Sequence, residues 1–272
     1  MASPFWDEAL AERYRQFHYE FPERPLAGRT VIVAGGTGGL GAATVALLAR
    51  EGARVIVGFR SNRERAAALR RAVQEQFGQT PDLVEGDILH PGVRRAFLEA
   101  AEKLGTPLAG AAIFPGDPAR IAFEALDQRA MHASLEANYI GPALLAKELG
   151  GAMEQRGGAL VLLASMQAVS AFPSSLNYGA PKAALVHAAR ILAQQWPSVR
   201  VNVVAPGATV AGMGGNSVSA GKYDSYIQNR AIPRFGRPED VARAVRFFLE
   251  PDNYTTGQVL LVDGGLTLSR AR

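Results

Sequence analysis

Short apolar runs alternate along the chain with longer stretches in which apolar residues recur every three or four positions. The short runs are rich in Val, Ile, Leu and Ala, which is typical of strands buried on both faces of a sheet. The predicted strands are residues 30–34, 54–59, 82–85, 108–114, 159–164, 200–205 and 259–262. The predicted helices are residues 39–51, 63–77, 92–104, 127–155, 180–196 and 239–248, the fourth interrupted near Gly141-Pro142. This alternation predicts an α/β fold with a single doubly wound parallel sheet, flanked by helices on both faces.

Residues 1–27 depart from this pattern and are predicted to be an aromatic-rich helical extension. A helix over residues 7–19 begins at Asp7, and prolines end it. The extension holds six of the chain's 21 aromatic residues: Phe5, Trp6, Tyr14, Phe17, Tyr19 and Phe21. Because so much aromatic surface is costly in water, we expect the extension to pack on the body or on a partner subunit. Residues 28–272 contain no repeat or linker and are predicted to form one domain.

Composition excludes several kinds of site. The chain has no cysteine, which rules out disulfides, thiolate nucleophiles and cysteine-ligated metals. Its four histidines have no metal-ligand spacing, so we expect no metal site. No apolar run has the length of a signal-peptide core or a membrane span, so we expect a cytoplasmic protein without membrane contact. The net charge of +4 comes from scattered residues, which favours a phosphorylated small molecule over a nucleic-acid partner.

A glycine-rich turn joins the first predicted strand of the sheet to the helix that follows it. The pattern Gly36-x-Gly38-x-x-Gly41 matches the general dinucleotide fingerprint, and Gly35-x-x-x-Gly39-x-Gly41 matches that of another Rossmann lineage. Backbone N–H groups and the positive end of the helix dipole stabilise a pyrophosphate at such a turn. The alternative is a turn that is merely tight. The residues predicted to bind the cofactor here are Gly35, Thr37, Gly38, Gly39, Leu40 and Gly41.

The end of the second predicted strand indicates which dinucleotide binds. NAD-binding proteins of this architecture usually place Asp or Glu there, about 20 residues after the glycine turn. This chain instead has Arg60, Ser61, Asn62 and Arg63, with no carboxylate before Glu64. Cationic side chains attract the 2′-phosphate of NADP(H). The segment therefore favours NADP(H), with Arg60, Ser61 and Asn62 as binding residues. The alternative is a solvated basic loop.

Further motifs follow in a fixed order. Ser165 precedes Tyr178-Gly179-Ala180-Pro181-Lys182 by thirteen residues, and Asn138 lies upstream in the long predicted helix. Asp87-Ile88, Pro206-Gly207, Arg234–Glu239, Thr256-Gly257-Gln258 and Asp263-Gly264-Gly265 complete the series. Over residues 28–268 the chain resembles the short-chain dehydrogenase/reductase family, in particular its NADP-preferring, 3-oxoacyl-reductase-like branch. The resemblance implies a Rossmann-type catalytic domain, and it disfavours an enoyl reductase, whose tyrosine and lysine are typically spaced further apart.

The tyrosine and lysine also make chemical sense on their own. A free tyrosine has a pKa of about 10, and a nearby cation lowers it. Lys182 follows Tyr178 by four residues, so on one helix the two side chains share a face. Lys182 is therefore predicted to tune Tyr178 as the acid/base for a carbonyl or an alcohol. Ser165 is predicted to hydrogen-bond the same substrate oxygen.

The resemblance implies the remaining roles. Tyr178 and Lys182 are also implied cofactor-binding residues, with Lys182 holding the nicotinamide ribose, and Asn138 orders a water that relays protons. Asp87 contacts the adenine with Ile88 packed nearby, the alternative for Asp87 being a turn-forming role. The other implied cofactor residues are Gly116, Pro206, Gly207 and Thr209.

Two segments depart from the family's pattern. Ile113-Phe114-Pro115-Gly116 replaces the usual Asn-Asn-Ala-Gly, so the asparagines that brace the sheet are missing. Ala211 stands where the family often has a threonine that contacts the nicotinamide, and Thr209 is a candidate substitute. Residues 211–232 correspond to a mobile lid over the substrate.

Together these observations predict an NADPH-dependent oxidoreductase that reduces a ketone or aldehyde to an alcohol, or catalyses the reverse. The small-molecule carbonyl or alcohol substrate is not identified. The alternative is a catalytically silent NADP(H)-binding regulatory protein, which the altered 113–116 segment favours and the complete Ser165, Tyr178, Lys182 and Asn138 set opposes. The resemblance also implies a homodimer or homotetramer, formed through the long helix and the Tyr178 helix.

Overall fold

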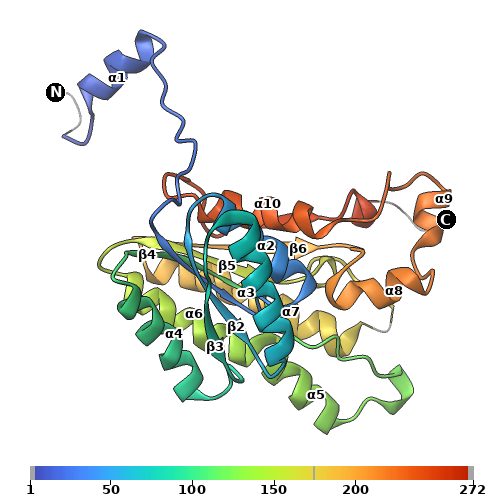
Figure 1. Cartoon of the computed structure of the whole chain (residues 1–272). Helices are drawn as coiled ribbons and strands as arrows, with labels where there is room; N and C mark the ends of the chain where they lie inside the picture. The colour runs from blue at the N-terminus through green and yellow to red at the C-terminus, as the bar shows by residue number, and fades with distance from the viewer. Residues whose placement is uncertain (1–3, 174, 269–272) are drawn as a thin grey trace.

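The computed structural model describes residues 4–173 and 175–268. In this part of the chain, seven parallel strands form one sheet in the order β3-β2-β1-β4-β5-β6-β7 (Figure 1). The strands are β1 Thr30–Ala34, β2 Arg54–Phe59, β3 Asp82–Glu85, β4 Leu108–Ile113, β5 Gly158–Leu163, β6 Val199–Pro206 and β7 Val259–Val262. The predicted doubly wound parallel sheet is therefore confirmed, and the order of the strands reverses between β1 and β4.

Helices cover both faces of the sheet. One face carries α2 Gly39–Arg50, α3 Arg63–Phe77 and α10 Pro238–Leu249, and the other carries α4 Pro91–Leu104, α6 Gly141–Met153 and α7 Leu176–Gln195. The shorter helices are α1 Glu8–Arg15, η1 Phe123–Ala125, α5 Gln128–Leu135, η2 Glu136–Ile140, η3 Met166–Ala168, η4 Gly212–Gly214, α8 Gly215–Ser219, α9 Asp224–Gln228 and η5 Leu266–Leu268. Within residues 4–173 and 175–268, no helix combines the length and apolarity needed to cross a membrane.

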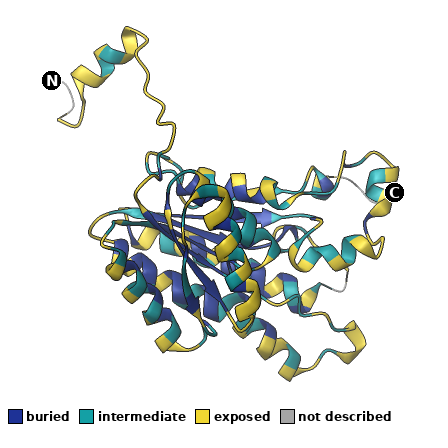
Figure 2. Ribbon diagram, in the orientation of Figure 1, coloured by how far each residue is buried: buried dark blue, intermediate teal, exposed yellow. Residues whose placement is uncertain are grey.

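The core has two layers because strand side chains alternate between the faces of the sheet. In β1, Ile32 and Ala34 join the cluster beneath α4, α6 and α7, whereas Val31 and Val33 join the cluster beneath α2, α3 and α10. All five residues of β1 are buried, as Figure 2 shows for the centre of the sheet. Burial on both faces explains why the strands are continuous apolar runs in the sequence.

The helix that carries Tyr178 begins earlier than the sequence predicts. We predicted a start at Ala180, whereas α7 begins at Leu176. Pro181 lies inside this helix and has no N–H for the Asn177 carbonyl one turn before it. The Ser134 hydroxyl donates to that carbonyl instead. A side chain from α5 thus satisfies the acceptor and allows the helix to extend through the proline.

The N-terminal extension does not pack on the body of its own chain. Helix α1 has no buried residue, and Phe5 and Phe21 are almost fully exposed. Figure 1 shows the helix standing away from the sheet. The expectation that the extension packs on the body is therefore wrong. Helix α1 is instead stabilised by short-range contacts, such as the ion pairs of Arg15 with Glu8 and Glu12. Leu26, near the end of the extension, is fully buried in the core.

Candidate active site

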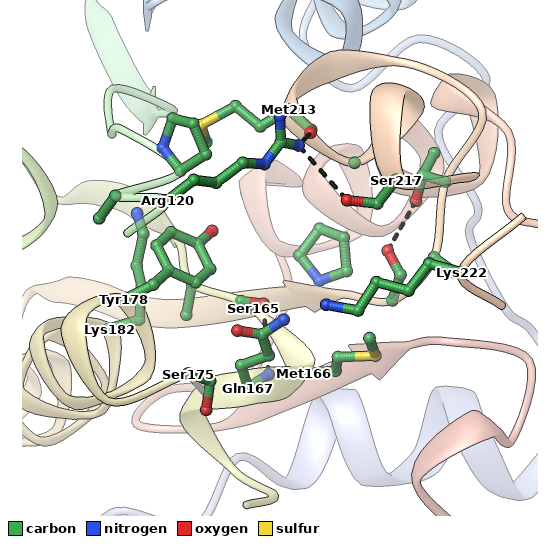
Figure 3. Close-up of a pocket in the computed structure, with 18 of the residues that line it drawn as sticks. Arg120, Ser165, Met166, Gln167, Ser175, Tyr178, Lys182, Met213, Ser217 and Lys222 are labelled. Atoms are coloured by element: carbon green, nitrogen blue, oxygen red, sulfur yellow. Dashed lines mark hydrogen bonds between the residues drawn. The ribbon is translucent and has the colours of Figure 1, made fainter. Parts of the chain in front are cut away.

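A cavity of about 550 Å³ opens at the carboxyl ends of β4, β5 and β6 (Figure 3). Among the residues that line it are Ser165, Tyr178 and Lys182, together with the segment that follows β6. Ligands of doubly wound sheets bind at the carboxyl ends of the strands, near the point where the strand order reverses. The three predicted proton-transfer residues therefore lie together where doubly wound sheets bind their ligands.

Tyr178 and Ser165 line the same part of the active-site cavity. Ser165 follows β5 and caps η3, accepting a hydrogen bond from the Gln167 amide at 3.2 Å. Tyr178, in the first turn of α7, lines the same cavity, and Ser165 lies near enough to act on the pKa of its hydroxyl. Burial raises the pKa of Tyr178 above its ordinary value of 10.0. At neutral pH the tyrosine is consequently protonated, which is the form that donates a proton to a carbonyl oxygen.

Lys182 lies one helical turn after Tyr178 and is 1% exposed. Its Nζ atom donates to the Leu163 carbonyl at 2.8 Å. Burial lowers the pKa of this lysine from 10.5 to about 8. The sequence predicts that Lys182 lowers the tyrosine pKa, but in the structure the burial of the hydroxyl dominates and raises it.

Asn138 is fully buried on η2, a single π-helical turn between α5 and α6. Its Oδ1 accepts the Asp117 amide at 3.1 Å, and its Nδ2 donates to the Asp117 carbonyl at 3.0 Å and to Ser134 Oγ at 3.1 Å. The side chain thus fixes the backbone that follows β4. This contact supplies bracing in a segment that lacks the family's usual asparagines.

The altered segment after β4 still allows close approach to the proton-transfer residues. Ile113 is buried in the core, and Phe114 lines the cavity. A Cβ atom on Gly116 would lie 2.8 Å from Asn138 Oδ1 and 3.1 Å from Lys182 Nζ. Any larger residue at this position would therefore displace the asparagine or the lysine.

The glycine-rich turn has the geometry of an anion site. Gly35 adopts φ +72°, and a Cβ atom there would lie 3.2 Å from Phe114 Cβ and from Pro115 N. Gly38 caps α2 with no side-chain hydrogen bond, and the first turn of α2 has no acidic residue. No side chain therefore caps the first amides of α2, and the positive dipole end of this helix favours a phosphate. Thr37, Gly39, Leu40 and Gly41 complete the turn, with Leu40 lining the active-site cavity.

A second cavity, of about 160 Å³, lies on the other side of the glycine turn. The residues lining it include Gly35, Arg60, Asp87, Ile88 and Gly116. The predicted adenine-side residues therefore share one pocket. Asp87 also fills the alternative, turn-forming role, because its Oδ1 accepts the Leu89 amide at 2.9 Å.

Two residues at the end of β2 have structural partners. Asn62 caps α3, with its Oδ1 accepting the Arg65 amide at 2.9 Å. Arg63 Nε donates to both Glu85 oxygens, at 2.9 and 2.7 Å, so its charge is neutralised. Arg60 and Ser61 are exposed.

The segment after β6 contributes its predicted residues to the active-site cavity. Pro206, Gly207 and Thr209 all line it. Thr209 is nearly fully buried and its Oγ1 donates to the Gly207 carbonyl at 3.1 Å, while Ala211 also faces the cavity.

Sequence reasoning missed several polar residues around the site. Arg65 Nε donates to the Thr37 carbonyl of the glycine turn. Its position in the first turn of the helix after the second strand was a usable signal. Arg120 and Lys222 line the active-site cavity from irregular segments, and Gln167 from the three-residue helix η3, so no periodicity shows which way these side chains point.

Comparisons with known proteins agree with this geometry. A family model described as enoyl-(acyl carrier protein) reductase matches residues 34–267. Carbonyl reductase family member 4 of Danio rerio is 33% identical, over 88% of this chain and 98% of its own length. The chain belongs to the short-chain dehydrogenase/reductase family. The family's members are oxidoreductases that bind a nicotinamide cofactor.

Other members of the short-chain dehydrogenase/reductase family are similar at lower identity. The 3-oxoacyl-(acyl-carrier-protein) reductase FabG of Rickettsia conorii is 28% identical, over 89% of this chain and 98% of its own. A solved short-chain type dehydrogenase/reductase from Mycobacterium ulcerans superposes with a TM-score of 0.83 at 27% identity, over 90% of this chain and 92% of that chain. The resemblance inferred from the motifs is thereby confirmed.

Proposed function

We propose that this chain is an NADP(H)-dependent oxidoreductase that interconverts a ketone or aldehyde with an alcohol, using Tyr178 as the acid/base. One observation carries the proposal: Tyr178 and Ser165 line one cavity, with Lys182 buried one helical turn after the tyrosine. A nicotinamide cofactor supplies the hydride when bound. The protein's task is to bind, orient and move the proton.

Each of the three side chains has a distinct role in this proposal. Tyr178 donates its proton to the carbonyl oxygen during reduction and accepts one from the alcohol in the reverse direction. Ser165 hydrogen-bonds the same oxygen and stabilises the charge that develops on it. Lys182 is a buried cation whose attraction for a phenolate makes proton loss from Tyr178 easier.

Asn138 is proposed to support the proton path without touching the substrate. Its side chain is occupied by Asp117 and Ser134. Its own carbonyl has no helical donor one turn ahead, because residue 142 is proline. That carbonyl is a suitable acceptor for the relay water that the family resemblance implies.

The preference for NADP(H) rests on charge near the adenine ribose. Arg60 lines the smaller cavity, and Arg65 is anchored on the Thr37 carbonyl of the glycine turn. No carboxylate lies in the segment from Arg60 to Arg63. We propose that Arg60 and Arg65 hold the 2′-phosphate, since guanidinium groups bind phosphate oxygens strongly.

Titration with NADPH and, separately, NADH, read by nicotinamide fluorescence, tests the cofactor. Tighter binding of NADPH is expected, and Arg60→Ala or Arg65→Ala should weaken it roughly tenfold while NADH binding is unchanged. Arg71→Ala is the matched control, because this exposed arginine lies further along α3. Failure to bind either cofactor would overturn the proposal. Binding of both cofactors without turnover of any carbonyl would instead favour the regulatory protein.

We also propose that the protein assembles as a homodimer or homotetramer through α7. Leu176 and Ile191 on this helix are 49% and 54% exposed. A second copy packed against α7 would cover these apolar side chains. Light scattering at micromolar concentration tests the proposal, and a monomer would contradict it.

A further inference from the structure

The active-site cavity has an unbalanced charge. Apart from Lys182, its described lining includes two cationic side chains, Arg120 and Lys222, and no aspartate or glutamate. In Figure 3 the Arg120 guanidinium is directed at Met213 and Ser217, and Lys222 extends its ammonium group into the cavity. The proposed chemistry at Tyr178 gives neither of them a role.

Arg120 has only neutral partners among the described residues. It comes from the loop between β4 and η1, and its Nη2 donates to the Met213 carbonyl at 2.7 Å and to Ser217 Oγ at 3.4 Å. Both acceptors belong to the lid segment, residues 211–232. A guanidinium has five N–H donors, so these contacts leave others for a ligand. The positive charge itself is not compensated by a carboxylate.

Lys222 supplies a second uncompensated charge from the lid. Its Nζ lies 5.8 Å from the centre of the Tyr223 ring, and it forms no ion pair within residues 4–173 and 175–268. In Figure 3 its ammonium group points toward Gln167. Tyr223 is itself buried against Met166 and Ile232, so the base of the lysine is held in place.

Two cations without a carboxylate partner inside a cavity attract an anion more strongly than they would in open water. We propose that the carbonyl substrate carries an anionic group, a carboxylate or a phosphate, and that Arg120 and Lys222 bind it while Tyr178 faces the carbonyl. This inference rests on the proposed function. Because Arg120 also holds the lid through Met213 and Ser217, a bound anion draws together the loop after β4 and the lid.

The test compares charged and neutral versions of the same substrate. Wild-type protein with NADPH is assayed on straight-chain oxo acids that differ in the spacing of carbonyl and carboxylate, and on their methyl esters. Dihydroxyacetone phosphate and dihydroxyacetone form the phosphate pair. The expected result is a preference for the anion of roughly ten- to a hundredfold in kcat/KM, the range for hydrogen bonds to charged groups. The better pair identifies carboxylate or phosphate as the ligand chemistry.

Variants assign the preference to residues. Arg120→Met and Lys222→Met should each lower the preference for the anion over its neutral partner, measured as the ratio of their kcat/KM values, about tenfold, while the Kd of NADPH stays unchanged. Arg129→Met, on an exposed arginine of α5 outside this cavity, is the control. Equal use of acid and ester by the wild type would overturn the inference and leave the proposed function standing. Weaker NADPH binding in both variants would assign the cations to the cofactor and also overturn it.

Calorimetry separates this inference from the proposed function. If no carbonyl is turned over, the proposed function fails, and binding of the acid and its ester to the NADPH-loaded protein still decides the inference. A preference for the acid that Arg120→Met abolishes supports an anion site. Equal binding, or no binding, overturns it.

Discussion

Pro142 follows Asn138 by four residues and cannot donate the hydrogen bond that a regular helix would place on the Asn138 carbonyl. The helix accommodates this defect with the π turn η2, in which the Gly141 amide donates to the Glu136 carbonyl, five residues back. Such turns are frequent at functional sites. Here the turn brings the Asn138 side chain onto the backbone of Asp117.

Replacing Pro142 should therefore impair turnover without affecting cofactor binding. Pro142→Ala restores the missing N–H and favours a regular helix, which rotates Asn138 away from Asp117. We expect kcat to fall roughly tenfold, in line with the cost of small displacements in an active site. NADPH affinity, measured by fluorescence, should be unchanged. Pro91→Ala, at the exposed start of α4, is the control. An unchanged kcat in Pro142→Ala would contradict a role for the π turn.

Because Lys182 is buried, its positive charge should lower the stability of the folded state by an amount that depends on pH. Its folded pKa is about 8, below the ordinary value of 10.5. Below pH 8 both the folded and unfolded states carry the proton, and the folded state bears the full cost of a buried cation. Between about pH 8 and 10.5 the unfolded state binds more protons, so stability rises with pH.

Lys182→Met removes this cost. At pH 7 the variant should be more stable than the wild type by something on the order of 2 kcal/mol, after allowing for the lost hydrogen bond to Leu163. The difference should shrink as the pH approaches 10. Urea unfolding at several pH values measures it, with Lys147→Met on the exposed side of α6 as control. A variant less stable than the wild type at pH 7 would show that the lysine is not a cost to the fold.

Two adjacent glycines in α6 should respond oppositely to alanine. A Cβ atom on Gly150 would collide with the buried Trp196 ring, whereas one on Gly151 would meet nothing within 4 Å. Gly150→Ala should destabilise the protein by about 1–3 kcal/mol through overpacking. Gly151→Ala should stabilise it by roughly 0.5–1 kcal/mol through helix propensity. Thermal or urea unfolding of the pair tests this, and equal effects would contradict the close contact of α6 with Trp196.

The N-terminal extension should add little to the stability of the body. Deleting residues 1–21 removes no buried side chain described by the structure, so the free energy of unfolding should change by less than about 0.5 kcal/mol. Leu26→Ala should cost about 2–5 kcal/mol, because Leu26 is fully buried in the core. A large loss on deletion would instead reveal packing on a partner subunit, the remaining alternative for its aromatic residues.

The sequence predicts the sheet well for a physical reason. Strands buried on both faces are continuous apolar runs, and β1 and β2 begin and end where those runs do. The edge strands β3 and β7 also have the predicted bounds, although they are less buried. The start of α7 was misplaced because Gly179 and Pro181 disfavour a helix locally, and only a contact from Ser134 compensates. Local propensity contains no information about such a distant partner.

Candidate site residues can be predicted from the sequence where their spacing along a helix determines which face they share. They cannot be predicted where they lie in loops, because no sequence pattern shows how a loop folds. Tyr178 and Lys182 share a helix face because they are four residues apart. Arg120 and Lys222 reach the cavity from irregular segments, and no pattern in the sequence brings them together. The raised pKa of Tyr178 was also missed, because burial depends on the whole fold rather than on the neighbouring lysine.

Tyr178→Phe tests the central proposal most directly. The substitution keeps the ring and removes the hydroxyl proposed to transfer the proton in the cavity. NADPH binding and carbonyl turnover are measured on the same preparation, with circular dichroism as a check of folding. The proposal predicts unchanged NADPH affinity and a loss of turnover of about a hundredfold or more, the contribution of a general acid. Turnover that survives at the wild-type rate, with folding intact, would show that another group transfers the proton.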